Sequence, residues 1–163
     1  MGAGKTTVGK KMAGLLNFSF IDLDQLIESE THETTDALFE KGESKFREIE
    51  AHVLRTTLSN TPTVIATGGG TPCFKDNMKW MNENGLTVYL KLAAGSLYHR
   101  LASAKKNRPL IKGKGDVALM EYIMETLAWR EPYYRQSRYT FKGENLVVAE
   151  VVEALKKAEP QLR

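Results

Sequence analysis

The sequence begins almost inside a phosphate-binding loop, and this feature restricts the possible folds more than any other. Loops of this type read G-x-x-x-x-G-K-[ST] and lie between a β-strand and an α-helix. Gly4, Lys5 and Thr6 supply the last three positions, and Gly2 lies just before them. The first glycine of the motif would fall before Met1, so we expect the strand that feeds the loop to be missing from this chain. A functional molecule is then expected to have roughly ten more residues before Met1, enough for one strand.

The residues of this loop suit nucleotide phosphates. Gly2 and Gly4 allow backbone angles that gather several N–H groups around an anion. Lys5 can bind the β- and γ-phosphates, and the Thr6 hydroxyl can ligate Mg²⁺. A helix predicted at residues 6–16 adds the positive end of its dipole. The alternative is an ordinary glycine-rich turn before a helix, without a ligand.

Length and composition exclude several classes of protein. A chain of 163 residues with 42% hydrophobic and 26% charged residues is expected to form a single domain over residues 1–163. Its net charge of +3 suits polyanionic ligands but is too small to argue for nucleic acid. Cys73 is the sole cysteine, which excludes an internal disulfide and fits a reducing compartment. No apolar run reaches the ~18 residues of a membrane span, so we expect a cytoplasmic protein.

Strand and helix patterns alternate along the chain, which is typical of an α/β fold with a mainly parallel sheet. The predicted strands occupy residues 18–21, 64–66, 87–92 and 139–141. The predicted helices occupy residues 6–16, 36–40, 44–58, 75–84, 96–104, 117–129 and 147–158. Pro132 is expected to bend or break the helical pattern that precedes it.

A basic segment from residue 105 to about 116 is predicted to be a mobile lid. It contains five Lys or Arg residues and no acid before Asp116. Arg108 stands out because Pro109 stiffens its backbone, and we expect it to bind phosphate. A solvated surface loop is the alternative for this segment.

Two aspartates follow the first predicted strand. Asp22 and Asp24 are two residues apart, so both side chains are expected on the same face. The carboxyl ends of strands in such sheets line the ligand crevice. One carboxylate could serve the Mg²⁺ shell while the other orients or deprotonates an acceptor hydroxyl. The alternative is that Asp24 only caps a helix starting near Gln25.

Arginines and glycines further along the chain are candidates for ligand binding. Arg47 and Glu50 are spaced to touch on one helix, and an arginine held in this way is aimed at a further carboxylate or phosphate. A surface ion pair is the alternative. Three glycines at residues 68–70 indicate close approach of a ligand to the backbone, or else a flexible turn. Arg130, just before Pro132, can project at a fixed angle or act as a charge at a helix C-terminus.

Taken in order, these motifs resemble those of shikimate kinase over essentially the whole chain. They are G-x-G-K-T at residues 2–6, D-x-D at 22–24, G-E-x-x-F-R-x-x-E at 42–50, G-G-G at 68–70, R-P-L at 108–110 and R-x-P-x-Y-R at 130–135. The resemblance implies a three-layer P-loop kinase of the nucleoside-monophosphate-kinase type. Such a fold has a central parallel sheet, a substrate-binding region at about residues 24–60 and a lid at about 105–116.

The same resemblance implies a reaction and its participants. The γ-phosphoryl group of ATP would pass to the 3-hydroxyl of shikimate, with Mg²⁺, in chorismate and aromatic amino acid biosynthesis. We expect a monomer whose partners are shikimate and ATP, without nucleic acid or membrane. Other small-molecule P-loop kinases, such as gluconate kinase, and a catalytically inactive nucleotide-binding paralogue are the alternatives.

Roles for individual residues follow from the resemblance. Lys5, Asp24 and Arg108 would be catalytic, with Asp24 contacting the ring hydroxyls as the base. Thr6 and Asp22 would serve Mg²⁺, and Glu50 would orient Arg47. The substrate carboxylate would be bound by Arg47 and Arg130, with the Gly69 backbone helping to place it. The ATP contacts would be Gly2, Ala3, Gly4, Lys5, Thr6, Thr7 and Arg108. In residues 141–145 the chain departs from relatives that carry an adenine-side arginine, which leaves Arg100 as a candidate.

Overall fold

The computed structural model describes residues 2–103 and 115–162, and all of its paired strands are parallel. Strand β1 (Ser19–Asp22) pairs with β2 (Thr63–Ala66), and β3 (Val88–Lys91) pairs with β4 (Tyr139–Lys142). In each pair the last residues of the two strands lie opposite each other. Among the described residues these pairs are two separate two-stranded sheets. The predicted α/β class with parallel strands is confirmed.

Helices follow and separate the strands, close to the predicted positions. They are α1 (Lys5–Leu16), α2 (Leu23–Thr31), α3 (Thr35–Glu40), α4 (Glu43–Thr56), the 3₁₀ helix η1 (Thr71–Cys73), α5 (Asn77–Asn84), α6 (Ala94–Ser103), α7 (Asp116–Tyr134), α8 (Val148–Ala158) and the 3₁₀ helix η4 (Pro160–Leu162). Within residues 2–103 and 115–162, no helix has the length and apolar composition needed to cross a membrane.

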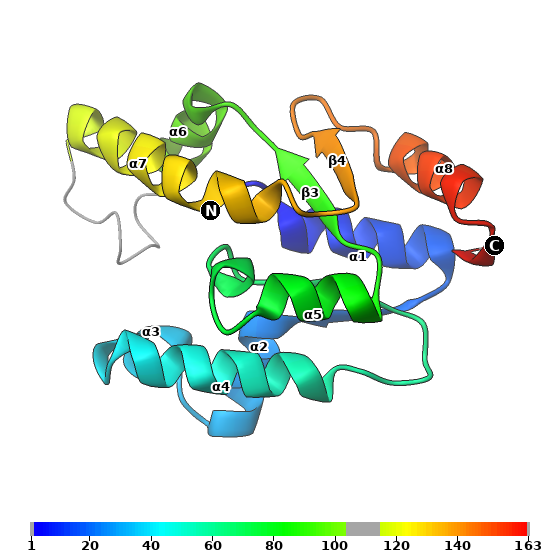
Figure 1. The fold of residues 1–163 in the computed structure, drawn as a ribbon. Coiled ribbons are helices and arrows are strands. Elements are labelled where there is room, and N and C mark those ends of the chain that lie inside the picture. The colour runs from blue at the N-terminus through cyan, green and yellow to red at the C-terminus, as the bar shows by residue number, and fades with distance from the viewer. Residues whose placement is uncertain (1, 104–114, 163) are drawn as a thin grey trace. The chain divides into compact units, whose positions relative to one another are not determined.

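The chain divides into two compact units (Figure 1). Residues 1–3 and 78–144 form the first unit, and residues 4–77 and 145–163 form the second. The first unit contains β3, β4, α6 and α7. The second contains β1, β2, helices α1 to α4 and α8. The second unit therefore carries most of the residues that the sequence singles out as candidates for catalysis and binding.

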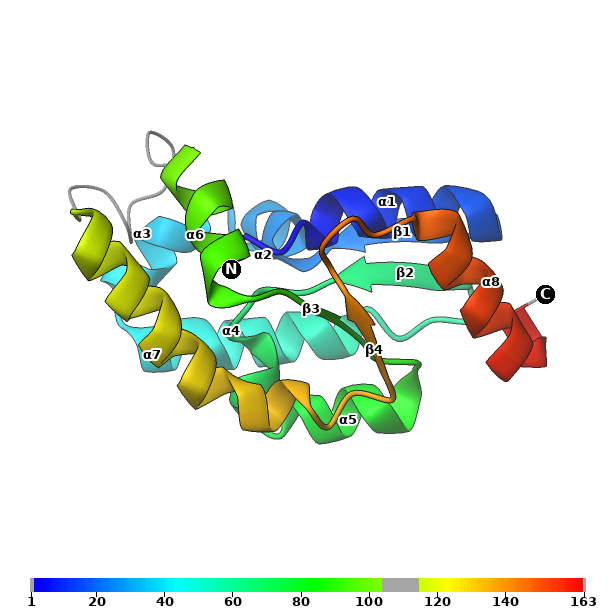
Figure 2. The same cartoon turned by 90° about the horizontal axis from the view of Figure 1, so that it is seen from above.

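In the second unit, α1 packs against β1, β2 and α8, while α2, α3 and α4 pack on one another (Figure 2). Helix α4 buries one face, on which Phe46, Glu50, Val53 and Leu54 are each at most 3% exposed. Their spacing follows the helical period of the core-facing stripe of an amphipathic helix. The same face also carries Arg47, which is 6% exposed, so an ion pair lies inside an otherwise apolar layer.

In the first unit, α6 and α7 lie side by side (Figure 1). Their contact is filled by a cluster of buried apolar side chains, namely Leu92, Leu97, Leu101, Leu119 and Ile123. Gly2 lies against this cluster, since a Cβ atom added there would be 3.2 Å from the Leu101 side chain. The start of the phosphate-binding loop is therefore packed against the core of the first unit.

The placement of the two aspartates differs from the prediction. Strand β1 ends at Asp22, and Asp24 lies in the first turn of α2, a helix that the sequence analysis considered only as the alternative beginning near Gln25. Asp24 is not part of the strand, so the rule that strand residues two apart face the same side does not apply to Asp22 and Asp24. Asp22, rather than Asp24, is the N-cap, because its Oδ1 accepts from the backbone N–H groups of Asp24 and Gln25 at 3.2 and 3.4 Å.

Helix α7 continues through Pro132 and ends at Tyr134, so Pro132 does not break the helix, which was predicted to end at residue 129. A proline in a helix removes one backbone hydrogen bond, and the helical bonding resumes when the Arg135 N–H donates to the Glu131 carbonyl at 3.0 Å. Arg130 therefore lies inside the last turns of the helix rather than at its end. The predicted lid at residues 105–116, including Arg108, lies outside the described residues except for residues 115 and 116.

Candidate active site

The phosphate-binding loop has the backbone that its glycines predict. Gly2 and Gly4 have φ angles of 62° and 86°, in the left-handed region that favours glycine. Gly4 is the N-cap of α1, and its carbonyl accepts from the Val8 N–H at 2.9 Å. Lys5, Thr6 and Thr7 form the first turn of that helix, and the N–H groups and dipole at a helix N-terminus favour anions.

Thr6 and Asp22 lie together at the end of β1. The Thr6 hydroxyl donates to Asp22 Oδ2 at 2.8 Å, while Oδ1 of the same carboxylate caps α2. In the described part of the chain, no group of three or more His, Cys, Asp or Glu side chains could hold a metal. A hydroxyl with one carboxylate nevertheless fits Mg²⁺ chemically, because Mg²⁺ commonly keeps several waters and binds substrate phosphates.

Asp24 occupies an environment that disfavours its charge. Loss of hydration is the largest effect that raises the pKa of its carboxyl group, followed by the negative charges of Asp22 and Glu50. Lys5 acts in the opposite direction without cancelling them. The residue as a whole is exposed, but its Oδ1 lies 3.2 Å from the Cβ position of Gly68. A carboxylate with a raised pKa is a better proton acceptor than an ordinary surface aspartate.

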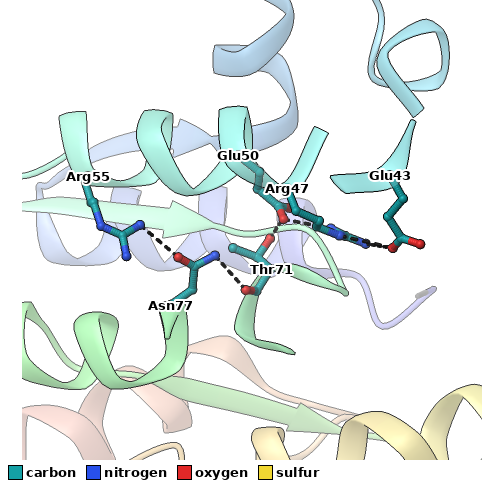
Figure 3. A network of polar contacts seen from close by, with 6 residues as sticks. All are labelled: Glu43, Arg47, Glu50, Arg55, Thr71 and Asn77. Atoms are coloured by element: carbon teal, nitrogen blue, oxygen red, sulfur yellow. Dashed lines mark hydrogen bonds and ion pairs between the residues drawn. The ribbon is translucent and has the colours of Figure 1, made fainter. Parts of the chain in front are cut away.

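Arg47 and Glu50 form a buried ion pair on α4 (Figure 3). Arg47 Nη1 donates to Glu50 Oε2 at 2.7 Å, and the two side chains are 7% and 1% exposed. The predicted contact is therefore confirmed, and the alternative of a surface pair is wrong. Arg47 Nε and Nη2 also donate to Glu43 Oε1, at 3.3 and 3.2 Å. Glu43 is largely exposed, so its ion pair with Arg47 is weaker than the buried pair between Arg47 and Glu50.

Three aromatic rings enclose the Arg47 guanidinium. Its Cζ lies 4.3, 5.0 and 5.1 Å from the ring centroids of Phe74, Phe39 and Phe46. Each distance is within the range of a cation–π contact, and the rings also restrict the rotamers of the arginine. The guanidinium is therefore held in place before any ligand arrives.

Two of the three glycines at residues 68–70 are explained by side chains of the protein itself. A Cβ atom on Gly70 would lie 2.5 Å from Arg47 Nη2 and 2.9 Å from Cζ. A Cβ atom on Gly68 would lie 2.9 Å from Thr71 Oγ1 and 3.1 Å from Glu50 Oε1. Packing within the protein, which the sequence analysis did not consider, is therefore enough to require glycine at these two positions. Gly69 lies between them in the same turn.

The geometry leaves Arg47 able to bind an anion. A guanidinium has five N–H groups. Three of them are hydrogen-bonded to Glu43 and Glu50 within the described part of the chain. One N–H on each terminal nitrogen remains for a ligand, and a pair of this kind matches the two oxygens of a carboxylate.

The sequence analysis did not identify Thr71, which holds the Glu50 carboxylate through a hydrogen bond, or Asn77, which in turn holds Thr71. The Thr71 hydroxyl donates to Glu50 Oε1 at 2.6 Å, and the Asn77 amide donates to the Thr71 carbonyl at 2.9 Å (Figure 3). Both residues are fully buried. Thr71 directly follows the triple glycine, which is the only signal that could have indicated it. Nothing in the sequence around Asn77 points to this role.

The other predicted site residues belong to the first unit or lie outside the described residues. Arg130 belongs to the first unit, and its Nε is buried with no hydrogen-bond partner among the described residues. Arg100, also in the first unit, donates to the carbonyls of Ala3 and Gly143 at 3.1 and 3.4 Å. It therefore ties the start of the phosphate-binding loop to the end of β4. Arg108 lies outside the described residues.

Comparisons with known proteins agree on one family. The sequence model of shikimate kinase matches residues 1–158. A shikimate kinase from Bacteroides thetaiotaomicron is 48% identical over 147 residues, which cover 90% of this chain and 84% of that protein. A crystal structure of shikimate kinase from B. thetaiotaomicron matches with a TM-score of 0.90 and 44% identity, over 97% of this chain and 93% of that one. Shikimate kinase from Acinetobacter baumannii in complex with shikimate matches with a TM-score of 0.85 and 32% identity, over 98% and 90% of the two chains.

Proposed function

The chain belongs to the shikimate kinase family and has shikimate kinase activity, and from this premise we propose which of its residues perform the reaction. The family uses ATP and Mg²⁺, and its enzymes are transferases of aromatic amino acid biosynthesis. The γ-phosphoryl group of ATP passes to the 3-hydroxyl of shikimate. The observation that carries the proposal is the buried, pre-oriented guanidinium of Arg47, which keeps two N–H groups for a carboxylate.

We propose that the phosphates of ATP bind to the loop before α1 and to the first turn of that helix. The contributing residues are Gly2, Ala3, Gly4, Lys5, Thr6 and Thr7. The left-handed glycines, the helix N-terminus and the Lys5 ammonium group support this proposal, because all three attract an anion. Arg108 is proposed as a further phosphate ligand on the basis of the family resemblance alone.

The Thr6 hydroxyl and the Asp22 carboxylate are proposed to serve Mg²⁺, Thr6 directly and Asp22 through water. When bound, Mg²⁺ neutralises negative charge on the β- and γ-phosphates. The 2.8 Å hydrogen bond between the two side chains supports the proposal, since it fixes both oxygens at one place beside the phosphate loop.

Shikimate carries a single carboxylate, and we propose Arg47 as its ligand. The two remaining N–H groups can bind both carboxylate oxygens, and the backbone of Gly69 in the neighbouring turn helps to place the group. Arg130 is a second candidate ligand for the carboxylate. This second role rests on the family resemblance alone.

Asp24 is proposed as the base that accepts the proton of the shikimate 3-hydroxyl while the oxygen attacks the γ-phosphorus. The raised pKa of its carboxyl group supports this role, because it increases the affinity of the group for a proton. The arginines, Lys5 and the loop N–H groups position the reactants and neutralise charge, which is how most phosphoryl-transfer enzymes gain their rate.

The test is a coupled assay of ADP release with ATP, Mg²⁺ and each of two acceptors. We expect turnover with shikimate and none above background with gluconate, which also carries a carboxylate and hydroxyl groups. Product analysis should show a phosphate ester at the 3-position. Turnover with gluconate alone would contradict the proposal, and nucleotide binding without transfer to either acid would indicate an inactive relative.

A further inference from the structure

We infer that Thr71 and Asn77 are positioning residues, which orient Arg47 toward the substrate by holding the carboxylate of Glu50 (Figure 3). The inference rests on the proposed role of Arg47 as the ligand of the shikimate carboxylate. It assigns a function to a chain of hydrogen bonds that continues from Arg47 to residues that do not contact the substrate in the proposed reaction. Its members, beginning at Arg47, are Glu50, Thr71, Asn77 and Arg55.

The first step is the double pairing of Glu50. Its Oε2 accepts from Arg47 at 2.7 Å, and its Oε1 accepts from the Thr71 hydroxyl at 2.6 Å. Glu50 is 1% exposed, so water cannot replace a lost donor easily. With both oxygens bound, the plane of the carboxylate is fixed, and a fixed carboxylate fixes the direction of the guanidinium that it binds. Groups that orient a ligand-binding residue in this way commonly affect binding strongly.

The second step is the anchoring of Thr71. The Asn77 side chain, 0% exposed, donates from Nδ2 to the Thr71 carbonyl at 2.9 Å. Its Oδ1 accepts from Arg55 Nη1 at 3.0 Å. Both ends of the amide are therefore satisfied, and Asn77 can bind in one orientation only. This bond keeps Thr71 at the position from which its hydroxyl reaches Glu50.

The third step is the strained turn that leads to Asn77. Lys75 and Asp76 have φ angles of 51° and 55°, in a region that residues other than glycine rarely adopt. Arg55 Nη2 donates to the Lys75 carbonyl at 3.1 Å, which holds this turn in place. Such backbone persists only where its surroundings fix it, and it often serves a site. This turn places Asn77 within hydrogen-bonding distance of the Thr71 carbonyl. Phe74, just before the turn, packs against the Arg47 guanidinium.

The test is a set of steady-state measurements on the full chain, in which shikimate and ATP are varied separately. Thr71→Val keeps the shape of the side chain and removes the hydroxyl donor. We expect the KM for shikimate to rise roughly tenfold, the size associated with one hydrogen bond to a charged group, while the KM for ATP stays unchanged. Thr71→Ser retains the hydroxyl and should restore the KM for shikimate.

A matched control is available in Thr57, which is also buried and donates to the Leu54 carbonyl at 2.7 Å, away from Glu50. Thr57→Val should lower the thermal stability without changing the KM for shikimate. Asn77→Asp is the second arm, because it keeps the acceptor for Arg55 and removes the donor to Thr71. It should raise the KM for shikimate in the same selective way.

The outcomes separate the inference from the proposed function. If Arg47→Lys raises the KM for shikimate but Thr71→Val and Asn77→Asp do not, the inference is wrong and the proposed role of Arg47 stands. If Arg47→Lys itself leaves that KM unchanged, the proposed role of Arg47 is wrong. Equal increases in the KM for shikimate and for ATP in Thr71→Val would show a general structural role and would overturn the inference.

Discussion

The hydroxyl of Thr6 donates a 2.8 Å hydrogen bond to Oδ2 of Asp22, and Oδ1 of that aspartate caps helix α2. One carboxylate thus joins the first turn of α1 to the first turn of α2. The observed cap and the proposed role of Asp22 toward Mg²⁺ make different demands, because the cap needs only an oxygen acceptor while service to Mg²⁺ needs the negative charge.

The two roles of Asp22 can be separated by two substitutions. Asp22→Asn should keep the cap, since Asn and Asp are about equally good N-caps, and leave the melting temperature close to that of the wild type. The Mg²⁺ concentration for half-maximal activity should rise roughly 10- to 100-fold, as for other residues that act through a metal-bound water. Asp22→Ala should in addition lose about 1 kcal/mol of stability. An unchanged Mg²⁺ dependence of Asp22→Asn would show that Asp22 is structural only.

Asp24→Asn should lower kcat by about 10²- to 10⁴-fold, the usual contribution of a general base. The same substitution should not lower the free energy of unfolding at neutral pH. Because the pKa is raised in the folded state, folding takes up a proton as the pH falls, and the charged carboxylate costs stability at neutral pH. Asp24→Asn should therefore melt no lower than the wild type at pH 7, with only a small gain because the residue is exposed.

The pH dependence checks this sign. The stability difference between Asp24→Asn and the wild type should shrink as the pH falls through the raised pKa, measured by thermal unfolding. The acid limb of the kcat profile should lie above the ordinary range for aspartate. Asp36, an exposed first-turn aspartate of α3, provides the control, and Asp36→Asn should leave kcat unchanged. A stability difference that widens at low pH would contradict the explanation.

Gly70→Ala should impair substrate binding more than folding. The new Cβ atom would meet the Arg47 guanidinium at 2.5 Å, and the end of that side chain can move more easily than the backbone. We expect the KM for shikimate to rise at least about tenfold through the lost bidentate contact, with the KM for ATP unchanged. Gly14→Ala is the control, since no atom lies within 4 Å of its added Cβ. It should raise stability by about 0.5–1 kcal/mol and leave both KM values unchanged.

Arg47→Ala should raise the KM for shikimate far more than the KM for ATP. It should also lower the free energy of unfolding by about 3–5 kcal/mol, because it leaves the buried charge of Glu50 without its partner. Arg47→Lys keeps a positive charge and should cost less stability, but it loses the planar fork and so should still raise the KM for shikimate. Chemical denaturation and steady-state kinetics measure the two effects. Equal changes in both KM values would mean that Arg47 is structural.

Much of this arrangement could be predicted from local patterns. The left-handed glycines of the phosphate loop and the contact between Arg47 and Glu50 follow from motif and helical spacing, and both are present. The periodic apolar positions also placed most helices within a few residues. These features depend on residues close together in the sequence, where spacing alone determines which side chains can meet.

Most of the misses come from contacts between segments that are distant in the sequence. Thr71 reaches Glu50 across 21 positions, and Arg55 reaches Asn77 across 22, so no local pattern records either contact. The same limitation hid the contact between Gly70 and Arg47, which are 23 positions apart. Helix α2 is a different, local case. The sequence analysis considered a helix starting near Gln25 only as the alternative for Asp24, whereas Asp22 is the cap and the helix begins at Leu23.

The aromatic enclosure of Arg47 also affects how quickly a ligand can bind. The rings of Phe39, Phe46 and Phe74 surround the guanidinium, and Glu50 binds it. The Arg47 side chain therefore does not need to change its rotamer after a ligand arrives. The association rate for a carboxylate ligand should then be limited by diffusion and charge attraction at this residue, and it should fall as the salt concentration rises. Stopped-flow measurements over a range of ionic strength should show a single binding phase, without the slower step that an ordering side chain would add.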